Sequence, residues 1–428
     1  MVSSILFRSV FWRGFYFLSV LLLNLVISRH FGAEMSGVIF YSSTIFSFIM
    51  LLLSVSLEAG MGYYLSSGKL KPLQLGILSI TWTSMILFLL FFSYPYWHKY
   101  LGDYFTFQER LVFAFSFIGG NLLITYFVSL FHAKLNFKAP QLMLCITQLL
   151  LILSFSIPEF SQITISDKTY ISFYFLSFPI SGILLASVFF WVYAKRSDLI
   201  FPSSKEFKDL IYFSSNAFLI NMLTFLLRRA DLVIVEKYCT AETLGNYIQV
   251  NKLSQMFYLL PVMLASAIFP LTAGGMYAAV NEKLQSLSRW IASAYLVIGL
   301  FIIFIGYWMF PFLLGKSFDQ MYLPMIIAFP GIITYSLAHL LAAYFSGRKM
   351  LFVNLQGIFL CLFLLTVLDL LLIPSGGIIM ASLVASVTSI TYFAYLFWWH
   401  HKMHRISIQS FFIMKPSDFN HLFSWMQR

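Results

Sequence analysis

The chain has 428 residues, of which 60% are hydrophobic and 10% are charged, and its formal net charge is +11. Ordinary soluble domains are about 45–50% apolar and about 25% charged, so this composition excludes a soluble protein that must cover its surface with polar side chains. The bilayer is therefore the solvent for most of the chain. Its apolar runs are long and continuous, which predicts an all-α polytopic bundle, because each helix satisfies its own backbone hydrogen bonds in lipid.

Membrane-spanning segments of about 20 apolar residues follow one another along most of the chain. We predict twelve, at about 5–27, 38–57, 73–97, 111–131, 140–158, 170–194, 209–227, 247–270, 291–314, 322–345, 352–373 and 377–399. The eighth is the least clean, because it opens with polar residues. The first should remain in the mature protein, since Ser28-Arg29-His30 is a poor match to a small-x-small cleavage site.

Lysine and arginine are distributed unevenly between the loops on the two sides of these spans. With the N-terminus placed in the cytoplasm, the cytoplasmic side collects most of them, including Lys69, Lys71, Lys134 and Lys138. The positive-inside rule then predicts that both termini are cytoplasmic. We assign the positive charge to these loops and to cations inside the bundle, so no nucleic-acid partner is expected. The three cysteines are too scattered to predict a metal site.

One short stretch of the chain occurs twice. Residues 27–37 match residues 235–245, with Ala-Glu-x-x-Gly in register from Ala33 and again from Ala241, 208 positions later. Each copy follows one long apolar run and precedes another, and their separation is close to half the chain. We therefore interpret the chain as two related halves. In polytopic membrane proteins, related halves around a central cavity are typical of transporters.

The natural join between the halves is the charged connection at 195–208. It carries Pro202 and a Ser-x-x-Glu capping box that begins at Ser203. We expect an N-terminal six-helix lobe at 1–200, a C-terminal six-helix lobe at 201–400 and a basic cytoplasmic tail at 401–428. No loop is long enough to hold a soluble domain.

Charged residues inside the predicted spans are the first candidates for function. Placing a charge in the membrane costs from about 2.5 to more than 10 kcal/mol, so such residues are rare and usually functional. Arg13, Glu58, Lys252 and Asp369 lie within spans. Glu58 and Asp369 are candidates for binding a coupling cation or carrying a proton, although each also fits an ordinary residue at a helix end.

Polar side chains form a stripe along the seventh span. Ser214, Asn221, Thr224, Arg228 and Asp231 recur at spacings of 7, 3, 4 and 3, which places them on one helix face. Such a face must meet a partner helix or a water-filled cavity. Two interpretations stay open for Arg228 and Asp231, at the end of this stripe. Arg228 and Asp231 pair with each other, or they line the cavity, with Asp231 as a further candidate for ion coupling.

A second polar strip opens the eighth span. Asn246, Gln249, Lys252 and Gln255 recur every three residues, and Asn251 lies beside them. Lys252 is too deep in the span to be only an interface anchor. In the first span, Arg13 shares a face with Asn24. Arg13 either lines a cavity open to the cytoplasm or lies at the level of the lipid headgroups.

Several short motifs, in order along the chain, resemble one transporter family. They are Arg29-His30-Phe31-Gly32 followed by Gly37 and Tyr41, Arg229-Ala230-Asp231 followed by Leu244-Gly245-Asn246-Tyr247, Pro261 and Pro270 around the eighth span, and Ile373-Pro374-Ser375-Gly376-Gly377. Together they resemble the polysaccharide-export branch of the multidrug/oligosaccharidyl-lipid/polysaccharide (MOP) exporter superfamily, and within it the O-antigen, Wzx-type, flippases. One departure is Ile378-Ile379-Met380 after the last glycine, where the family often has small residues.

The resemblance implies a MATE-like pair of six-helix lobes around a central cavity, and alternating access in the bacterial inner membrane. It implies that the substrate is an oligosaccharide on undecaprenyl pyrophosphate. The cations that would hold the pyrophosphate are Arg13, Arg228, Lys252 and, from the first motif, Arg29. The polar side chains that would line a lumen for the sugar are Asn24, Asn221, Thr224, Gln249, Asn251 and Gln255.

The expected partners are membrane lipids and, in the same pathway, the polymerase and the chain-length regulator. The sequence contains no recognisable nucleotide site or catalytic constellation, so no cofactor is expected. Energy would come from a Na⁺ or H⁺ gradient, from the substrate gradient or from a partner.

Two other functions stay open. A cation-coupled multidrug exporter of the same superfamily should place acids rather than bases in its lumen, and the charges inside these spans are more often basic. A membrane-embedded O-antigen polymerase or ligase would be an enzyme of a different class. Such enzymes usually carry catalytic arginines and histidines on one long periplasmic loop, and no loop of that length is expected here.

Overall fold

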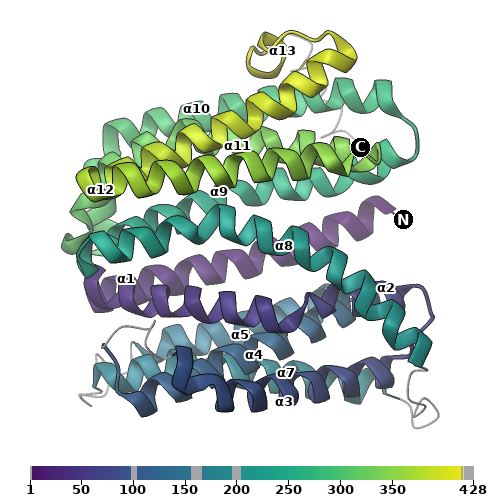
Figure 1. Ribbon diagram of the computed structural model, residues 1–428, viewed down its shortest axis with the longest axis vertical. Coiled ribbons are helices and arrows are strands. Elements are labelled where there is room, and N and C mark those ends of the chain that lie inside the picture. The colour runs from purple at the N-terminus through teal and green to yellow at the C-terminus, as the bar shows by residue number, and fades with distance from the viewer. Residues whose placement is uncertain (1, 98–103, 156–165, 195–203, 416–417, 419–428) are drawn as a thin grey trace. The chain divides into compact units, whose positions relative to one another are not determined.

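The computed structural model describes residues 2–97, 104–155, 166–194, 204–415 and 418, and nearly all of them are helical (Figure 1). The helices are α1 (Val2–Ser54), α2 (Leu57–Ser66), α3 (Pro72–Trp97), α4 (Phe107–Ala133), α5 (Lys138–Ser154), α7 (Asp167–Tyr193), α8 (Ser204–Tyr238), α9 (Ala241–Ala273), α10 (Tyr277–Leu314), α11 (Tyr322–Gly347), α12 (Leu351–His404) and α13 (Gln409–Phe412). A 3₁₀ helix, η3 (Lys316–Met321), precedes α11. The described residues contain no β-strand.

Two of the helices each hold a pair of predicted spans. α1 is broken at Gly32 (φ 69°) and α12 at Gly377 (φ 55°). A positive φ is accessible to glycine without the steric cost that a Cβ would cause, so both breaks fall where the backbone can bend. Counted in this way, each of the twelve predicted spans falls mainly on a helix over the residues that the structure describes.

Among the described residues, eight helices are long and apolar enough to cross a membrane. α5 is shorter, with 17 residues, and α9 is not one of the eight. α9 carries the polar strip that made the eighth span the least clean of the predictions. The chain is a polytopic membrane protein, and its prediction as an all-α bundle is confirmed.

The structure differs from the prediction after the second span. α1 ends at Ser54, Val55 and Ser56 adopt left-handed φ values of 50°, and α2 begins at Leu57. Glu58 therefore lies in the first turn of α2 rather than at the end of the span. An acidic side chain is favourable there because the helix dipole is positive at its N-terminus.

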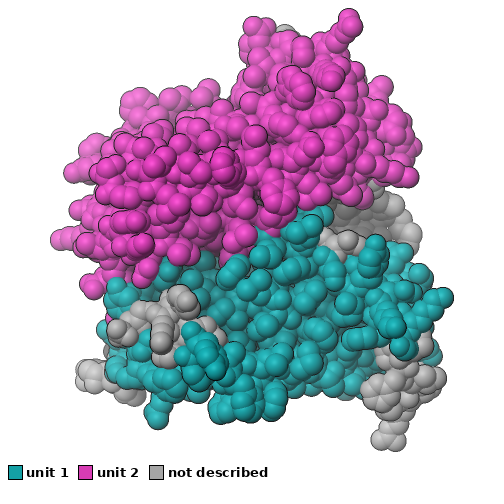
Figure 2. Space-filling view, viewed as in Figure 1, with its two compact units in different colours: residues 1–31, 38–222 teal, residues 32–37, 223–428 magenta. Residues whose placement is uncertain are grey.

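The chain forms two compact units, which Figure 2 shows in different colours. Unit 1 comprises residues 1–31 and 38–222, and unit 2 comprises residues 32–37 and 223–428. α8 thus begins in unit 1 and ends in unit 2. The join expected at 200/201 lies within 195–203, outside the described residues, and stays a prediction.

Aromatic rings fill the interior of unit 1 where α4 packs on α7. Phe113 and Phe175 stack with ring centroids 4.6 Å apart, and Phe117 meets Phe178 edge-on at 4.7 Å. Ring pairs of this kind add stabilisation of about 0.5–1.5 kcal/mol each beyond the apolar area that they bury. They hold the two helices in a fixed register.

In unit 2, η3 joins the two copies of the sequence repeat. The Ala33 backbone N–H donates a hydrogen bond to Ser317 Oγ at 2.9 Å, and Asn246 Nδ2 donates to the Ser317 carbonyl oxygen at 2.9 Å. Ala33 lies in the first copy, and Asn246 directly follows the second. One residue of η3 therefore fixes both copies at the same place.

The segment after α12 folds back onto α10. Arg289 of α10 donates from Nε to Asp418 Oδ2 at 2.6 Å and from Nη2 to Asp418 Oδ1 at 2.5 Å, and both side chains are buried. Arg289 also donates to the carbonyl oxygen of Ser410. Phe411 of α13 is fully buried. The part of the predicted tail that the structure describes is thus a packed element, and residues 401–404 belong to α12.

Candidate functional site

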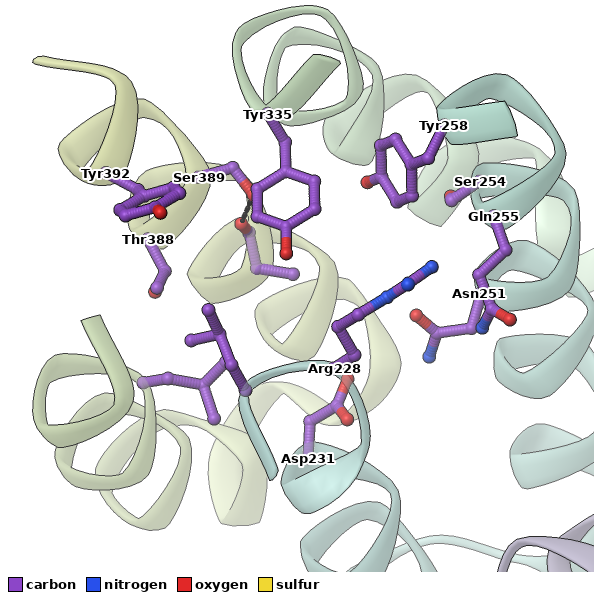
Figure 3. Close-up of a pocket in the computed structure, with 13 residues that line it drawn as sticks. Arg228, Asp231, Asn251, Ser254, Gln255, Tyr258, Tyr335, Thr388, Ser389 and Tyr392 are labelled. Atoms are coloured by element: carbon purple, nitrogen blue, oxygen red, sulfur yellow. Dashed lines mark hydrogen bonds between the residues drawn. The ribbon is translucent and has the colours of Figure 1, made fainter. Parts of the chain in front are cut away.

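A small polar cavity lies inside unit 2, between α8, α9, α11 and α12 (Figure 3). Its volume is about 60 Å³, which is room for a few water molecules. The lining residues are Leu227, Arg228 and Asp231 of α8, Asn251, Ser254, Gln255 and Tyr258 of α9, Tyr335 of α11, and Leu365, Ala385, Thr388, Ser389 and Tyr392 of α12. Hydroxyl, amide and aromatic groups thus surround one arginine.

Arg228 is the cation of this cavity. Its guanidinium carbon lies 5.3 Å from the centroid of the Tyr258 ring, a cation–π contact, and Figure 3 shows the group pointing between Tyr258, Gln255 and Asn251. Among the residues that the structure describes, Arg228 has no carboxylate within ion-pair distance. The interpretation in which Arg228 and Asp231 pair with each other is therefore wrong for this conformation.

The Asp231 carboxylate has other partners. Tyr247 Oη donates to Asp231 Oδ2 at 2.5 Å, and the backbone N–H of Leu232 donates to Oδ1 at 2.9 Å. These bonds hold the carboxylate at the edge of the cavity. These hydrogen bonds and the charge of nearby Arg229, rather than the Arg228 guanidinium, compensate the charge of Asp231.

Two more cations lie on the same two helices, Arg229 beside Arg228 and Lys252 near Arg229. Arg229 donates from Nη2 to Gln255 Oε1 at 3.1 Å, so its side chain is bound to α9 and does not extend to the headgroups. Lys252 of α9 is half-buried and lies near enough to Arg229 for the two charges to repel. The parts of α8 and α9 that carry Arg228, Arg229 and Lys252 are therefore rich in positive charge.

Asp369 of α12 is fully buried in the same unit, near Asp231. Within the described part of the chain, neither of its carboxylate oxygens has a hydrogen-bond partner. A buried carboxylate without a donor is unfavourable as an anion. A bound proton or cation would remove that cost.

The other predicted site residues are dispersed. Asn221, in unit 1, donates to Ser56 Oγ at 3.0 Å, and Arg29 is exposed. Asn24 and Thr224 are half-buried on α1 and α8, and Gln249 is buried on α9 outside the cavity lining. Arg13 lies in unit 1, where its Nη2 is 3.3 Å from His132 Nδ1. Of the thirteen predicted site residues, the cavity brings together Arg228, Asp231, Asn251 and Gln255.

Several lining residues were missed in the sequence. Tyr258, Tyr335 and Tyr392 are three of many aromatic residues, and nothing in their spacing marks them as lining a cavity. A signal did exist on α12, where Ser386, Thr388, Ser389 and Thr391 precede Tyr392 in an otherwise apolar span. Thr388 and Ser389 of this hydroxyl-rich run face the cavity.

No family model and no curated protein matches the chain. Solved structures do match, over almost their whole length. An Asp-to-Asn mutant of the Vibrio cholerae MATE transporter VcmN has 16% identity and a TM-score of 0.66, with 95% of this chain and 98% of that chain covered. The lipid II flippase MurJ, in an inward closed conformation, has 16% identity and a TM-score of 0.69, with coverage of 97% and 92%.

An inward-facing MATE-family multidrug transporter of the MOP superfamily has 13% identity and a TM-score of 0.68, with 91% of this chain and 94% of that chain covered. The chain shares the fold of these transporters. The prediction of twelve helices in two six-helix lobes is thereby confirmed. At these identities the likeness concerns the fold, and the Wzx-type branch and its substrate stay predictions.

Proposed function

We propose that the chain is a flippase for an oligosaccharide linked to undecaprenyl pyrophosphate, such as an O-antigen repeat unit. It would move this lipid from the cytoplasmic to the periplasmic leaflet of the bacterial inner membrane by alternating access. The observation that carries the proposal is Arg228, a guanidinium inside a membrane-embedded cavity with no acidic partner among the described residues. Arginine binds phosphate oxygens through paired, charge-assisted hydrogen bonds.

The sign of the charge favours this function over multidrug export. Arg228, Arg229 and Lys252 lie together, whereas Asp231, the acid at the cavity, is bound to Tyr247 and Leu232. A lumen for cationic drugs requires an acid that is available to the drug. The likeness to a structure described as a lipid II flippase also supports a lipid-linked substrate.

The size of the cavity limits what it would hold. A volume of about 60 Å³ fits a few water molecules, or a group of similar size, and not an oligosaccharide. We therefore assign the cavity to a phosphate of the head group. The sugars and the polyprenyl tail would lie outside it, with membrane lipids, and the polymerase and chain-length regulator would act on the product.

We assign energy coupling to Asp231 and Asp369. Both carboxyl groups are buried in unit 2, and Asp369 has no donor among the described residues. Binding of H⁺ or Na⁺ at Asp369 would neutralise a charge that burial makes costly, and release would restore it. Such a group responds to an ion gradient without any bound cofactor.

The sidedness of the lipid-linked oligosaccharide tests the proposal. In a deletion strain, repeat units should accumulate on the cytoplasmic leaflet, and the wild-type chain should restore their arrival at the outer leaflet. Units that cross normally in the deletion strain but fail to polymerise would assign the chain to a later step and contradict the proposal.

A further inference from the structure

A chain of hydrogen bonds joins three helices of unit 1 through one histidine. Nη2 of Arg13, on α1, lies 3.3 Å from His132 Nδ1 on α4. Nε2 of Gln141, on α5, lies 3.3 Å from His132 Nε2. Gln141 is 4% exposed, so the inner end of this chain is anchored in the interior.

The chemistry of the three side chains fixes the direction of these bonds. Arginine can only donate, so His132 Nδ1 accepts, and the imidazole proton lies on Nε2. That N–H needs an acceptor, and Gln141 supplies one when its amide is turned so that Oε1 faces the ring, an orientation that the positions of the heavy atoms do not distinguish. The turn also gives a partner to Gln141 Oε1, which is otherwise buried without one.

Arg13 lies at the end of unit 1 that we expect to be cytoplasmic. His132 is in the last turn of α4, and the turn that follows carries Lys134 before Lys138 begins α5. Lys138 Nζ lies 5.6 Å from the centroid of the Trp12 ring, next to Arg13 in sequence. This end of the unit is thus basic, and the described residues place no carboxylate in an ion pair with Arg13.

We propose that His132 and Gln141 are positioning residues that hold the Arg13 guanidinium for the pyrophosphate of a polyprenyl-linked substrate on the cytoplasmic side of unit 1. The inference rests on the proposed function. An arginine that only anchors the protein among headgroups needs no fixed orientation and extends freely toward water. The Arg13 side chain is instead tied through His132 to a buried amide, and that bond uses one of its five N–H groups.

The binding of undecaprenyl pyrophosphate to the purified full-length protein in nanodiscs tests the inference. His132→Phe keeps a ring that packs on Phe137, 5.1 Å away, but removes the acceptor. It should weaken binding about tenfold, as expected for one hydrogen bond to a charged group. His132→Gln, which restores an acceptor, should recover most of the loss. Gln141→Glu should bind as the wild type, and Gln141→Met should resemble His132→Phe.

A double-mutant cycle separates positioning from a structural role. Because His132 acts through Arg13, His132→Phe should have no further effect in an Arg13→Ala background. Additive effects, or wild-type binding by His132→Phe, would overturn the inference. His30→Phe is the matched control, since His30 packs against Phe155 and Tyr170 in the same unit. Thermal unfolding of each variant shows whether the fold is retained.

Competition identifies the source of the phosphate. Phosphatidylglycerol at equal concentration should not displace undecaprenyl pyrophosphate; equal displacement would make Arg13 a headgroup anchor and overturn the inference. Flipping in proteoliposomes is measured separately. If the wild-type protein binds the lipid through Arg13 but does not flip it, the proposed function alone is contradicted. If His132→Phe binds and flips the lipid as well as the wild type does, the positioning role alone is contradicted.

Discussion

Gly37 and Gly245 hold equivalent positions in the two copies of the sequence repeat, and in unit 2 they lie against each other. A Cβ on Gly37 would be 2.7 Å from the Cα atom of Gly245 and 3.1 Å from the carbonyl oxygen of Ala241. A Cβ on Gly245 would overlap the carbonyl oxygen of Ala33. Ala33 and Ala241 are equivalent as well, so each glycine meets the alanine carbonyl of the other copy. Reciprocal contacts of this kind are typical of a two-fold relation.

Substitution at this crossing should be costly. Gly37→Ala and Gly245→Ala each place a methyl group into backbone atoms that cannot move aside as a side chain can, so each should reduce the free energy of unfolding by about 1–3 kcal/mol or more. Thermal unfolding of the purified variants measures this. Gly14→Ala is the control, since nothing lies within 4 Å of a Cβ at that position. Equal effects at all three glycines would contradict the close approach.

Arg228→Ala should weaken the binding of undecaprenyl pyrophosphate by about tenfold to a hundredfold, because a hydrogen bond to a charged group contributes about 1.5–3 kcal/mol. The membrane level of the protein should not change. Arg228→Lys should recover part of the loss if a point charge suffices, and none if a paired contact is required. Lys237→Ala, an exposed cation on the same helix, serves as the control. Full activity of Arg228→Ala would remove the cavity from the mechanism.

Asp369→Asn should separate transport from the ion gradient. An amide is nearly the same size as the carboxyl group but cannot release a proton or bind Na⁺ as an anion, so flipping should no longer respond to an imposed gradient. The free energy of unfolding should be unchanged or higher, since a costly buried charge is removed. Asp319→Asn, at an exposed position in η3, is the control. A variant that still follows the gradient would exclude Asp369 as the coupling group.

The contact between Arg289 and Asp418 should be sensitive to acid. Hydrogen bonds from Arg289 are the main cause that lowers the pKa of Asp418 from its ordinary 3.8 to about 2. The pair therefore contributes its full stability above pH 3.8 and loses it as the pH falls through about 2. Asp418→Asn should reduce stability at pH 7 by about 3–5 kcal/mol, because it leaves Arg289 buried and unpaired.

Protease accessibility of the segment after α12 reports this loss. The segment should be protected in the wild type at pH 7 and cleaved in Asp418→Asn. Glu282→Gln, an exposed acid on α10, should leave protection unchanged. Cleavage that is the same in the wild type and in Asp418→Asn would mean that the ion pair does not hold the segment.

Hydropathy predicted most of this fold because lipid places one dominant demand on a spanning segment, a continuous apolar surface. The helix breaks at Gly32 and Gly377 fit the same hydropathy pattern, since Gly32 lies between the first two predicted spans and Gly377 is the first residue of the twelfth. α2 was not predicted. Its start depends on left-handed φ values at Val55 and Ser56, residues whose own preferences oppose that conformation.

The candidate site was only partly predictable. Arg228, Asp231, Asn251 and Gln255 belong to polar stripes that helical spacing reveals, and the cavity brings them together. His132 was not identified as the partner of Arg13, because the two are 119 residues apart and no local pattern relates them. Tyr258 and Tyr335 were hidden among 24 tyrosines, most of which have no such role.

If the proposed function holds, a cavity of about 60 Å³ would contact a phosphate of the lipid head and not the sugars beyond it. We therefore expect this cavity to tolerate chemical changes in the glycan, so that a change of sugar requires no change in the residues around Arg228. Residues that contact the sugars and residues that bind the phosphate would then change independently of each other.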